Sequence, residues 1–340
     1  MPGANHLTGA EALVRMLEAY GVRHIFGLCG DTTLPLYDAL AQLDHSITHF
    51  LTRDERHAAY MADGYARVTG RPGVCEGPSG GGATYIAPGV VEANESSVPI
   101  LAITTDIATT SGGKFPLTEL DQVAMFRPLT KWNASLDDAS RLPATIRKAF
   151  REMTTGRPGA VHLALPFDTQ KAEVPASEVW ADETHGTFPA NPTAPDPAAV
   201  RDAANLILDA RRAVILCGGG PVIAGAFAEV KTLAEVLDIP VATTVSGQGI
   251  LAETDAHAVG VVGSNGGVTA TRAVVDEADL VIFIGCRAGS VTTERWRFPA
   301  VGTRVIHIDS DPAVIGANYR TEVGLIGDAR LTLTALNAEL

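Results

Sequence analysis

The chain has 340 residues, enough for two domains of ordinary size or one large one, and its 46% hydrophobic and 19% charged residues are typical of a globular protein. Its 26 basic and 39 acidic side chains give a formal charge of -13, which repels phosphate backbones and anionic lipid. We therefore expect no nucleic acid and no membrane surface among its partners.

The amino-terminal segment MPGANHLTGAEAL lacks the basic flank and apolar core of a secretory signal. No apolar run elsewhere approaches the roughly 20 residues that a membrane-spanning helix needs. These features favour a cytoplasmic protein.

The four cysteines, Cys29, Cys75, Cys217 and Cys286, are isolated from one another and do not have the spacing of a zinc site. Each lies in or just after an apolar run, where a free cysteine packs as a small hydrophobic side chain. We expect most of them to be buried thiols, and we expect no metal ligands in this chain.

The first half of the chain begins with a helix and then alternates short apolar runs with longer amphipathic segments. Thr8 and Glu11 form the T-x-x-E pattern of a capping box, and Gly21 is a stop signal, so a helix is predicted between them. The pattern then predicts strands at 22–27, 47–52, 71–75, 98–105 and 159–166, with helices at 33–43, 53–70, 81–93 and 140–156. Such alternation indicates a mostly parallel sheet covered on both faces.

The pattern breaks in a proline-rich, polar stretch and restarts near residue 196. The later segments predict helices at 196–210 and 224–238, strands at 213–219, 240–245, 279–285 and 303–310, and a final strand and helix within 323–340. The predicted fold is α/β, with two doubly wound, mostly parallel-sheet domains. We assign residues 1–168 to the first domain, 169–195 to a linker and 196–340 to the second, Rossmann-like domain.

Ligands of open α/β sheets bind beyond the carboxyl ends of the strands, so the loops at 27–31, 53–55 and 76–84 are the places to search. The glycine-rich loop at 76–84 matches neither the P-loop nor the dinucleotide fingerprint, and is either an anion site or a tight turn. By position alone, Glu55 is either a site acid or a first-turn carboxylate that complements the helix dipole after Asp54 caps the helix. His57 is likewise either a base or an exposed ring.

Several segments, taken together and in this order, resemble the thiamine diphosphate enzymes, the family that includes acetolactate synthase and other 2-oxoacid decarboxylases and carboligases. The resemblance covers nearly the whole chain. It is carried by VRHIFGLCGDTTLPLYDAL, RDERHAAYMADGYARVTGRPGV, GGGATYIAPGVVEANESSVPILAIT, LDQVAMFRPLTKW, RPGAVHLALPFD, ETDAHAVGVVG, ADLVIFIGCRAGSVTTE and RVIHIDSDPAVIGAN.

The resemblance implies that the first domain binds the pyrimidine of thiamine diphosphate, and that Glu55 is the catalytic glutamate whose carboxyl hydrogen-bonds N1′ of the aminopyrimidine. His57 and Thr118 fall at positions that imply contact with substrate. Gly81, Tyr85, Leu117 and Thr118 depart from acetolactate synthases, which changes the predicted acceptor pocket. The residues implied to bind the cofactor are Leu28, Cys29, Gly30, Glu55, Ser79, Gly80, Gly82 and Thr84.

The second domain resembles the central domain of the family, which holds FAD in some members. FAD is possible here but not favoured, because the stretch at 286–294 and residues 264–265 depart from the FAD-binding versions. The positions where a dinucleotide is expected are Gly218, Gly219, Gly263, Arg287 and Asp309.

The family's diphosphate site uses a Gly-Asp-Gly segment and asparagine ligands for Mg²⁺, and these 340 residues contain no Gly-Asp-Gly. We therefore expect a split enzyme, in which a second subunit carries the diphosphate and Mg²⁺-binding domain and two copies of this chain meet within a heterotetramer. The expected activity is that of a decarboxylase or carboligase acting on a small 2-oxoacid.

Two other functions have to be compared with this one. One is a catalytically silent regulatory or nucleotide-binding relative of the same fold, since fold does not imply function. The other is a nicotinamide or flavin oxidoreductase, which needs a G-x-G-x-x-G turn after a strand, and the sequence has none.

Overall fold

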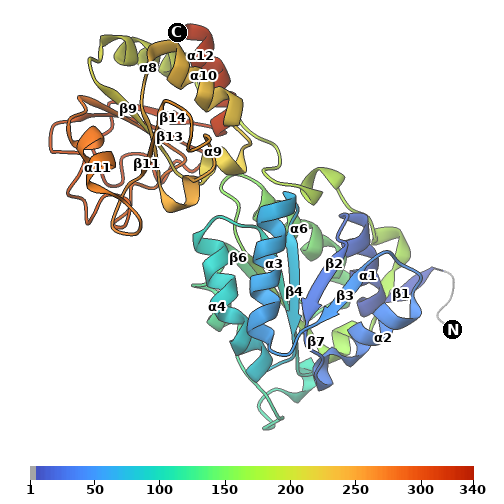
Figure 1. Cartoon of the computed structure of the whole chain (residues 1–340). Helices are drawn as coiled ribbons and strands as arrows, with labels where there is room; N and C mark the ends of the chain where they lie inside the picture. The colour runs from blue at the N-terminus through green and yellow to red at the C-terminus, as the bar shows by residue number, and fades with distance from the viewer. Residues whose placement is uncertain (1–4) are drawn as a thin grey trace. The chain divides into compact units, whose positions relative to one another are not determined.

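The computed structural model describes residues 5–340, which form two compact units, one up to Ala190 and one from Asn191 onward (Figure 1). Each unit contains a six-stranded parallel sheet within the described residues. The predicted α/β fold class, with two doubly wound parallel-sheet domains, is confirmed. None of the helices in residues 5–340 has the length and apolar character needed to cross a membrane.

The sheet of the first unit has the strand order β3-β2-β4-β5-β7-β6, and every neighbouring pair is parallel. Its strands are β2 (His24–Gly27), β3 (Thr48–Leu51), β4 (Gly73–Gly77), β5 (Ile100–Asp106), β6 (Trp132–Ser135) and β7 (Val161–Pro166). The helices around it are α1 (Gly9–Ala19), α2 (Leu34–Gln42), α3 (Glu55–Thr69), α4 (Gly81–Glu95), α5 (Gln122–Phe126), α6 (Leu142–Thr154) and α7 (Phe167–Lys171).

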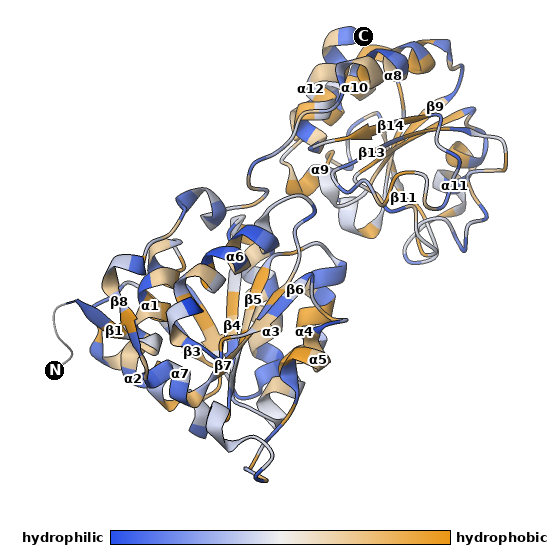
Figure 2. Ribbon diagram, turned by 180° about the vertical axis from the view of Figure 1, so that it is seen from behind, coloured by the Kyte–Doolittle hydropathy of each residue, from blue (hydrophilic) through white to orange (hydrophobic). Residues whose placement is uncertain are grey.

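Side-chain alternation along the strands separates two apolar layers of this unit. On β5, Leu101 and Ile103 pack with α1, α2 and α6, whereas Ile100 and Ala102 pack with α3, α4 and α5. Because successive residues of a strand point to opposite faces, a strand that is apolar throughout needs cover on both. Figure 2 shows the resulting apolar strands between amphipathic helices.

The α1 capping box is formed as the sequence predicts. The Glu11 backbone N–H donates to Thr8 Oγ1 at 3.2 Å, and the Thr8 N–H donates to Glu11 Oε2 at 2.7 Å. Two amides that have no partner within the helix are thereby satisfied.

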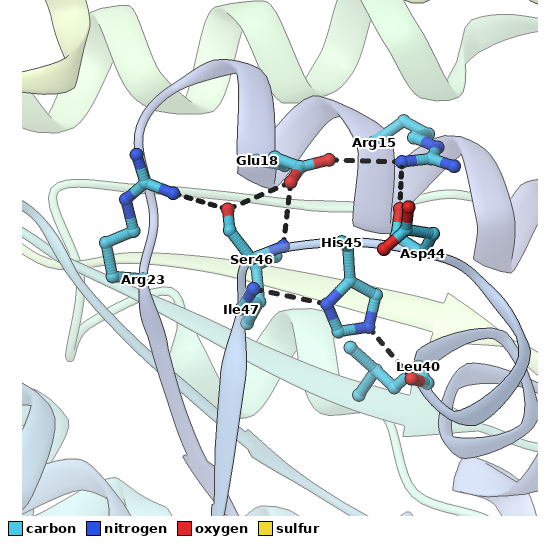
Figure 3. A network of polar contacts seen from close by, with 8 residues as sticks. All are labelled: Arg15, Glu18, Arg23, Leu40, Asp44, His45, Ser46 and Ile47. Atoms are coloured by element: carbon cyan, nitrogen blue, oxygen red, sulfur yellow. Dashed lines mark hydrogen bonds and ion pairs between the residues drawn. The ribbon is translucent and has the colours of Figure 1, made fainter.

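A polar network at the amino end of β3 ties that edge strand to α1 (Figure 3). Glu18 Oε1 accepts from the Ser46 N–H at 2.8 Å and from the Ser46 hydroxyl at 2.9 Å, and these bonds lower the pKa of Glu18. The guanidinium of Arg15 donates to the Asp44 carbonyl at 2.7 Å, and His45 Nδ1 accepts from the Ile47 N–H at 3.1 Å. The loop before β3 is therefore held at the edge of the sheet opposite the strand carboxyl ends.

The second unit has the strand order β11-β10-β9-β12-β13-β14, also parallel throughout. Its strands are β9 (Ala213–Cys217), β10 (Val241–Thr243), β11 (Ala258–Val261), β12 (Leu280–Ile284), β13 (Arg304–Asp309) and β14 (Val323–Ile326). Its helices are α8 (Pro197–Asp209), α9 (Gly220–Ile223), α10 (Phe227–Leu237), α11 (Thr269–Asp276) and α12 (Ala329–Glu339).

The structure adds elements that the sequence pattern did not predict. Within the stretch 169–195, β8 (Glu173–Pro175) pairs antiparallel with β1 (His6–Thr8), a partner at the other end of the unit. The strands β6 and β11 and the helices α5, α7 and α11 were also missed, because they are short and have too few residues to show a period. The limits of the proposed linker and domains remain a prediction.

The cysteines follow the expectation except for one. Cys75, Cys217 and Cys286 are buried, and burial raises the pKa of each thiol. Cys29 is exposed, because it lies in the loop beyond β2 and not in the strand itself.

The capping box gives a first test. The Thr8→Ala substitution removes the acceptor for the Glu11 amide and should lower the free energy of unfolding by about 0.5–2 kcal/mol in urea denaturation. Thr232→Ala, at an exposed position inside α10, is the control and should change that energy by no more than about 0.5 kcal/mol. Equal effects of the two substitutions would show that the box does not stabilise α1.

Candidate functional site at the carboxyl edge of the first sheet

The sheet of the first unit has its topological switch point between β2 and β4. The chain runs outward from β2 to β3 on one side and from β4 to β5 on the other, so the loops after β2 and β4 leave in opposite directions. A crevice at the carboxyl ends of the strands is expected at this point. The two loops, residues 28–30 (the β2 loop) and residues 78–80 (the β4 loop), are among those that the sequence singled out.

Glu55 is the first residue of α3 and is 8% exposed. Asp54 caps the helix, since its side chain accepts from the Arg56 N–H at 2.9 Å, and it also pairs with the Arg56 guanidinium. These contacts hold the pKa of Asp54 below its usual range. The cap is the one predicted, but the neighbouring Glu55 carboxyl is withdrawn from water and does not lie on the helix surface. Burial of this acid is difficult to explain by the helix dipole alone.

The β4 loop and the start of α4 pack against Glu55 so closely that glycine is required. A methyl group at Gly82 would lie 2.4 Å from Pro78 Cδ and 3.1 Å from Glu55 Oε1. A methyl group at Gly30 would lie 2.5 Å from Pro78 Cβ. Pro78 therefore packs between Gly30 of the β2 loop and Gly82 at the start of α4, and Glu55 Oε1 lies beside Gly82.

A line of hydroxyl groups crosses the same edge of the sheet. Thr105 and Thr32 are joined through their Oγ1 atoms at 2.8 Å, Thr32 donates to Ser79 Oγ at 3.2 Å, and Ser79 Oγ lies 2.6 Å from Thr118 Oγ1. Thr118 donates in turn to the Leu117 carbonyl at 2.5 Å. Because each hydroxyl has a single proton to donate, all four donors point from Thr105 toward Thr118. Ser79 and Thr105 are buried, whereas Thr118 is exposed.

The structure thus brings together only some of the predicted residues. Glu55, Gly30 and Gly82 meet at Pro78, and Ser79 and Gly80 meet Thr118, where a methyl group on Gly80 would lie 2.7 Å from Thr118 Cβ. Two further predicted residues touch this group at its edge: the Thr84 N–H donates to the Gly80 carbonyl at 3.1 Å, and exposed Cys29 donates its thiol to the Gly30 carbonyl at 3.9 Å. Leu28 is partly buried and His57 is exposed, and no side-chain contact joins either of them to the group among the described residues.

Sequence reasoning missed Pro78, Thr32 and Thr105 as parts of this edge. Thr105 lies next to the end of β5, so the rule that placed the search beyond strand ends could have found it. Pro78 lies in the loop at 76–84 that the sequence singled out, but its packing against Gly30, 48 positions away, has no local signal. The same holds for Thr32, whose hydroxyl donates to Ser79, 47 positions away.

The glycines of the second unit are explained by backbone packing. A methyl group at Gly218 would lie 2.1 Å from the Gly285 carbonyl oxygen, and one at Gly263 would lie 2.3 Å from the Val291 carbonyl oxygen. These contacts require glycine whether or not a nucleotide binds. The carboxyl ends of β9 and β12 meet at the switch point of this sheet. Gly219 follows β9, exposed Arg287 follows β12, and buried Asp309 ends β13.

Comparison with known proteins identifies both units. Residues 7–125 match the family model of the thiamine pyrophosphate enzyme N-terminal TPP-binding domain, and residues 200–336 match the model of the thiamine pyrophosphate enzyme central domain.

Related whole proteins are acetolactate synthases. The chain is 42% identical over 337 residues to a probable acetolactate synthase large subunit of Methanocaldococcus jannaschii, covering 98% of this chain and 56% of that protein. It is 39% identical over 335 residues to the probable large subunit of Methanococcus aeolicus, covering 98% and 55%. It is 36% identical over 331 residues to an acetolactate synthase of Arthrospira platensis, covering 96% and 57%. The chain spans about half the length of these relatives.

The close packing at Gly82 gives a second test. Gly82→Ala places a methyl group against Pro78 and Glu55, and should cost about 1–3 kcal/mol of unfolding free energy. Gly81→Ala is the matched control, because its methyl group would meet only Tyr85 Cε2, at 3.9 Å. It should be neutral or stabilise by up to about 1 kcal/mol. Comparable destabilisation by both changes in urea denaturation would contradict the packing argument.

Proposed function

The chain belongs to the thiamine pyrophosphate enzyme family, and we propose that it is the subunit of an acetolactate synthase-like enzyme that binds the aminopyrimidine end of thiamine diphosphate. One observation carries the proposal. The acid Glu55 is buried near the switch point of the first sheet, beside closely packed loops in which glycine is required.

The residues at this edge fit the cofactor. A heteroaromatic ring is best bounded by backbone and small side chains, and the loops that contain Gly30, Gly80 and Gly82 carry only small or compact side chains next to Glu55, such as Ser79 and Pro78. A ring nitrogen needs a hydrogen-bonding partner that can hold a proton, and the Glu55 carboxyl is such a group. We assign Leu28, Cys29, Ser79 and Thr84 to the rest of the pyrimidine site on family resemblance.

When bound, the cofactor would supply the nucleophilic carbon that acts on the ketone of the substrate. The contribution of this chain is to bind and orient the pyrimidine and to control one proton. Glu55 holds that proton on its carboxyl, shares it with the ring nitrogen N1′ and takes it back as the cycle closes. Because Glu55 is shielded from water, the hydrogen bond is stronger than it would be at the surface.

We propose a small 2-oxoacid as the substrate and CO₂ as a product. Thr118 is the exposed end of the hydroxyl line, and its oxygen is available to a polar group of the substrate. His57, exposed on α3, is proposed as a more distant substrate contact. Both carboligation and simple decarboxylation are consistent with these residues.

We further propose that a partner chain binds the diphosphate and its Mg²⁺, and that two copies of each chain assemble as a heterotetramer. The proposal rests on the family resemblance, in which a Gly-Asp-Gly segment and asparagine ligands hold Mg²⁺, and residues 1–340 contain no Gly-Asp-Gly. Mg²⁺ prefers oxygen ligands together with phosphate oxygens, so the metal and the diphosphate are expected on the same partner.

The partner is tested by affinity purification of the tagged chain from its native host, with co-purifying proteins identified by mass spectrometry. We expect a partner in equal amount that carries Gly-Asp-Gly followed by asparagine ligands. We also expect the eluate to release CO₂ from pyruvate or another 2-oxoacid when thiamine diphosphate and Mg²⁺ are added. Tight, Mg²⁺-dependent binding of the cofactor by the purified chain alone would contradict the split arrangement.

The role of Glu55 is tested in the same assembly. Glu55→Gln keeps the size of the side chain but removes the exchangeable carboxyl proton, and should lower the rate of CO₂ release by roughly 10²–10⁴-fold. Glu92→Gln, at an exposed glutamate of α4, is the control and should leave the rate unchanged. Full activity of Glu55→Gln would instead support a relative in which this site is catalytically silent.

A further inference from the structure

The hydroxyl line at the carboxyl edge of the first sheet has a fixed direction, and Thr32 is the residue that fixes it. Thr32 Oγ1 accepts from the Ser79 N–H at 3.1 Å and lies 2.8 Å from Thr105 Oγ1, while its own proton goes to Ser79 Oγ at 3.2 Å. A hydroxyl has one proton and two lone pairs. Because the Thr32 proton is given to Ser79, Thr32 has to accept from Thr105. Both of its lone pairs are then filled, so the bond to Ser79 Oγ cannot reverse.

The inner end of the line is held by two buried amide side chains. Gln122 Nε2 donates to the Thr105 carbonyl at 3.1 Å, and Gln170 Nε2 donates to the Thr32 carbonyl at 2.9 Å. Both glutamines are buried. Their bonds fix the backbone from which the Thr105 and Thr32 hydroxyls project, so the line starts from a rigid point of the protein interior.

Thr118, the exposed end of the line, is held in a strained conformation. Its φ is 72°, in the left-handed region that a β-branched residue rarely adopts. Gly80 makes room for it, since a methyl group there would lie 2.7 Å from Thr118 Cβ. Glycine would adopt the backbone conformation of Thr118 more easily. The strain therefore indicates that the threonine side chain has a function at this position.

The line ends in a hydrogen-bond donor. Ser79 Oγ accepts from Thr32 and donates to Thr118 Oγ1 at 2.6 Å, which leaves the Thr118 proton as the outer end of the line. That proton goes to the carbonyl of the preceding residue, Leu117, at 2.5 Å. A hydroxyl that accepts a hydrogen bond becomes a stronger donor in turn. An acceptor oxygen of a ligand can therefore replace the Leu117 carbonyl as the partner of Thr118.

The acids next to the two ends of the line have other partners. Glu119 Oε1 accepts from the Gly113 N–H at 2.7 Å, and Asp106 Oδ1 accepts from the Ile107 N–H at 2.8 Å. Neither carboxylate is bonded to a hydroxyl of the line among residues 5–340. The acceptor for the Thr118 proton thus comes from the backbone or from a ligand.

We propose that this directed line makes Thr118 a hydrogen-bond donor to an acceptor oxygen of the ligand, and that Ser79, Thr32 and Thr105 are positioning residues for it. The acceptor is a carbonyl or carboxylate oxygen, the two kinds that a 2-oxoacid carries. Identifying this ligand with the substrate rests on the proposed function. The donor end itself is a property of this chain alone.

The experiment is an NMR titration of the full chain, without cofactor or partner, that follows the Thr118 methyl and Ser79 amide resonances. The probes are pyruvate, acetate, acetone and ethylammonium chloride at constant ionic strength. Pyruvate should give saturable shifts of both resonances, and acetate and acetone then show which of its oxygens binds. Ethylammonium can donate hydrogen bonds but not accept them, so it should leave both resonances unchanged.

Two substitutions of Thr105 separate its hydroxyl from its packing. Thr105→Val keeps the shape but frees a lone pair of Thr32, so the line can reverse, and pyruvate binding should weaken about 2–10-fold, the effect of one hydrogen bond. Thr105→Ser keeps the hydroxyl and should bind pyruvate as tightly as the natural chain. In the active assembly, Thr105→Val should raise KM for the 2-oxoacid and leave kcat nearly unchanged, as expected for a lost binding interaction.

The proposal is overturned if Thr105→Val binds pyruvate as tightly as the natural chain, or if Thr105→Ser loses as much affinity as Thr105→Val. Shifts with ethylammonium alone, or no saturable shift with pyruvate up to on the order of 0.1 M, would overturn it as well. Should Thr105→Val not fold, Ser79→Ala replaces it, because it removes the bond nearest to Thr118. Pyruvate binding by this chain in an assembly that releases no CO₂ would leave the inference standing and count against the proposed function alone.

Discussion

The first unit depends on how closely the segment after β4 approaches the segments around it. Gly27 leaves space for the Glu76 carboxyl, Gly30 for Pro78, and Gly82 for both Pro78 and Glu55. Side chains at these positions would separate the β2 loop, β4 and the start of α4. The glycines therefore do more than permit turns, because they allow two carboxyls and a proline ring to lie at the switch point of the sheet.

Burial of acidic groups at that point has an energetic consequence. A carboxyl removed from water favours its neutral form, and it retains a charge only where donors surround it. Among residues 5–340, Glu76 Oε1 has two hydrogen-bond partners, Tyr37 and His49, and Oε2 has none. Glu55 is the first residue of a helix whose cap is made by a different acid, Asp54. The capping and the burial are thus divided between adjacent residues, which leaves the Glu55 carboxyl available for a ligand.

The two units share the same architecture, but the glycines at their switch points pack against different groups. Each has a parallel sheet whose switch point is bordered by glycine-rich loops. In the second unit the glycines serve backbone contacts such as that between Gly218 and Gly285. In the first unit they make room for side chains that can hold protons. This difference is the reason that the proposed chemistry is assigned to the first unit, and it illustrates that a glycine-rich loop is informative only together with the groups that fill the space it leaves.

The sequence by itself determined the α/β class, most strands and helices, the α1 capping box and the Asp54 cap, because these follow from the spacing of neighbouring residues. It placed Glu55 among the candidates, because the loop after β3 lies at the carboxyl edge of a parallel sheet, while position alone left open whether this acid serves a site or the helix dipole. Only the tertiary structure decided that Glu55 is buried against Gly82, that Thr105, Thr32, Ser79 and Thr118 form one hydroxyl line, and that β1 pairs with β8. The hydrogen bonds of Tyr37 and His49 to Glu76 were likewise decided only by the tertiary structure. These contacts join residues far apart in the chain, and they depend on strand order and register, which local periodicity does not encode.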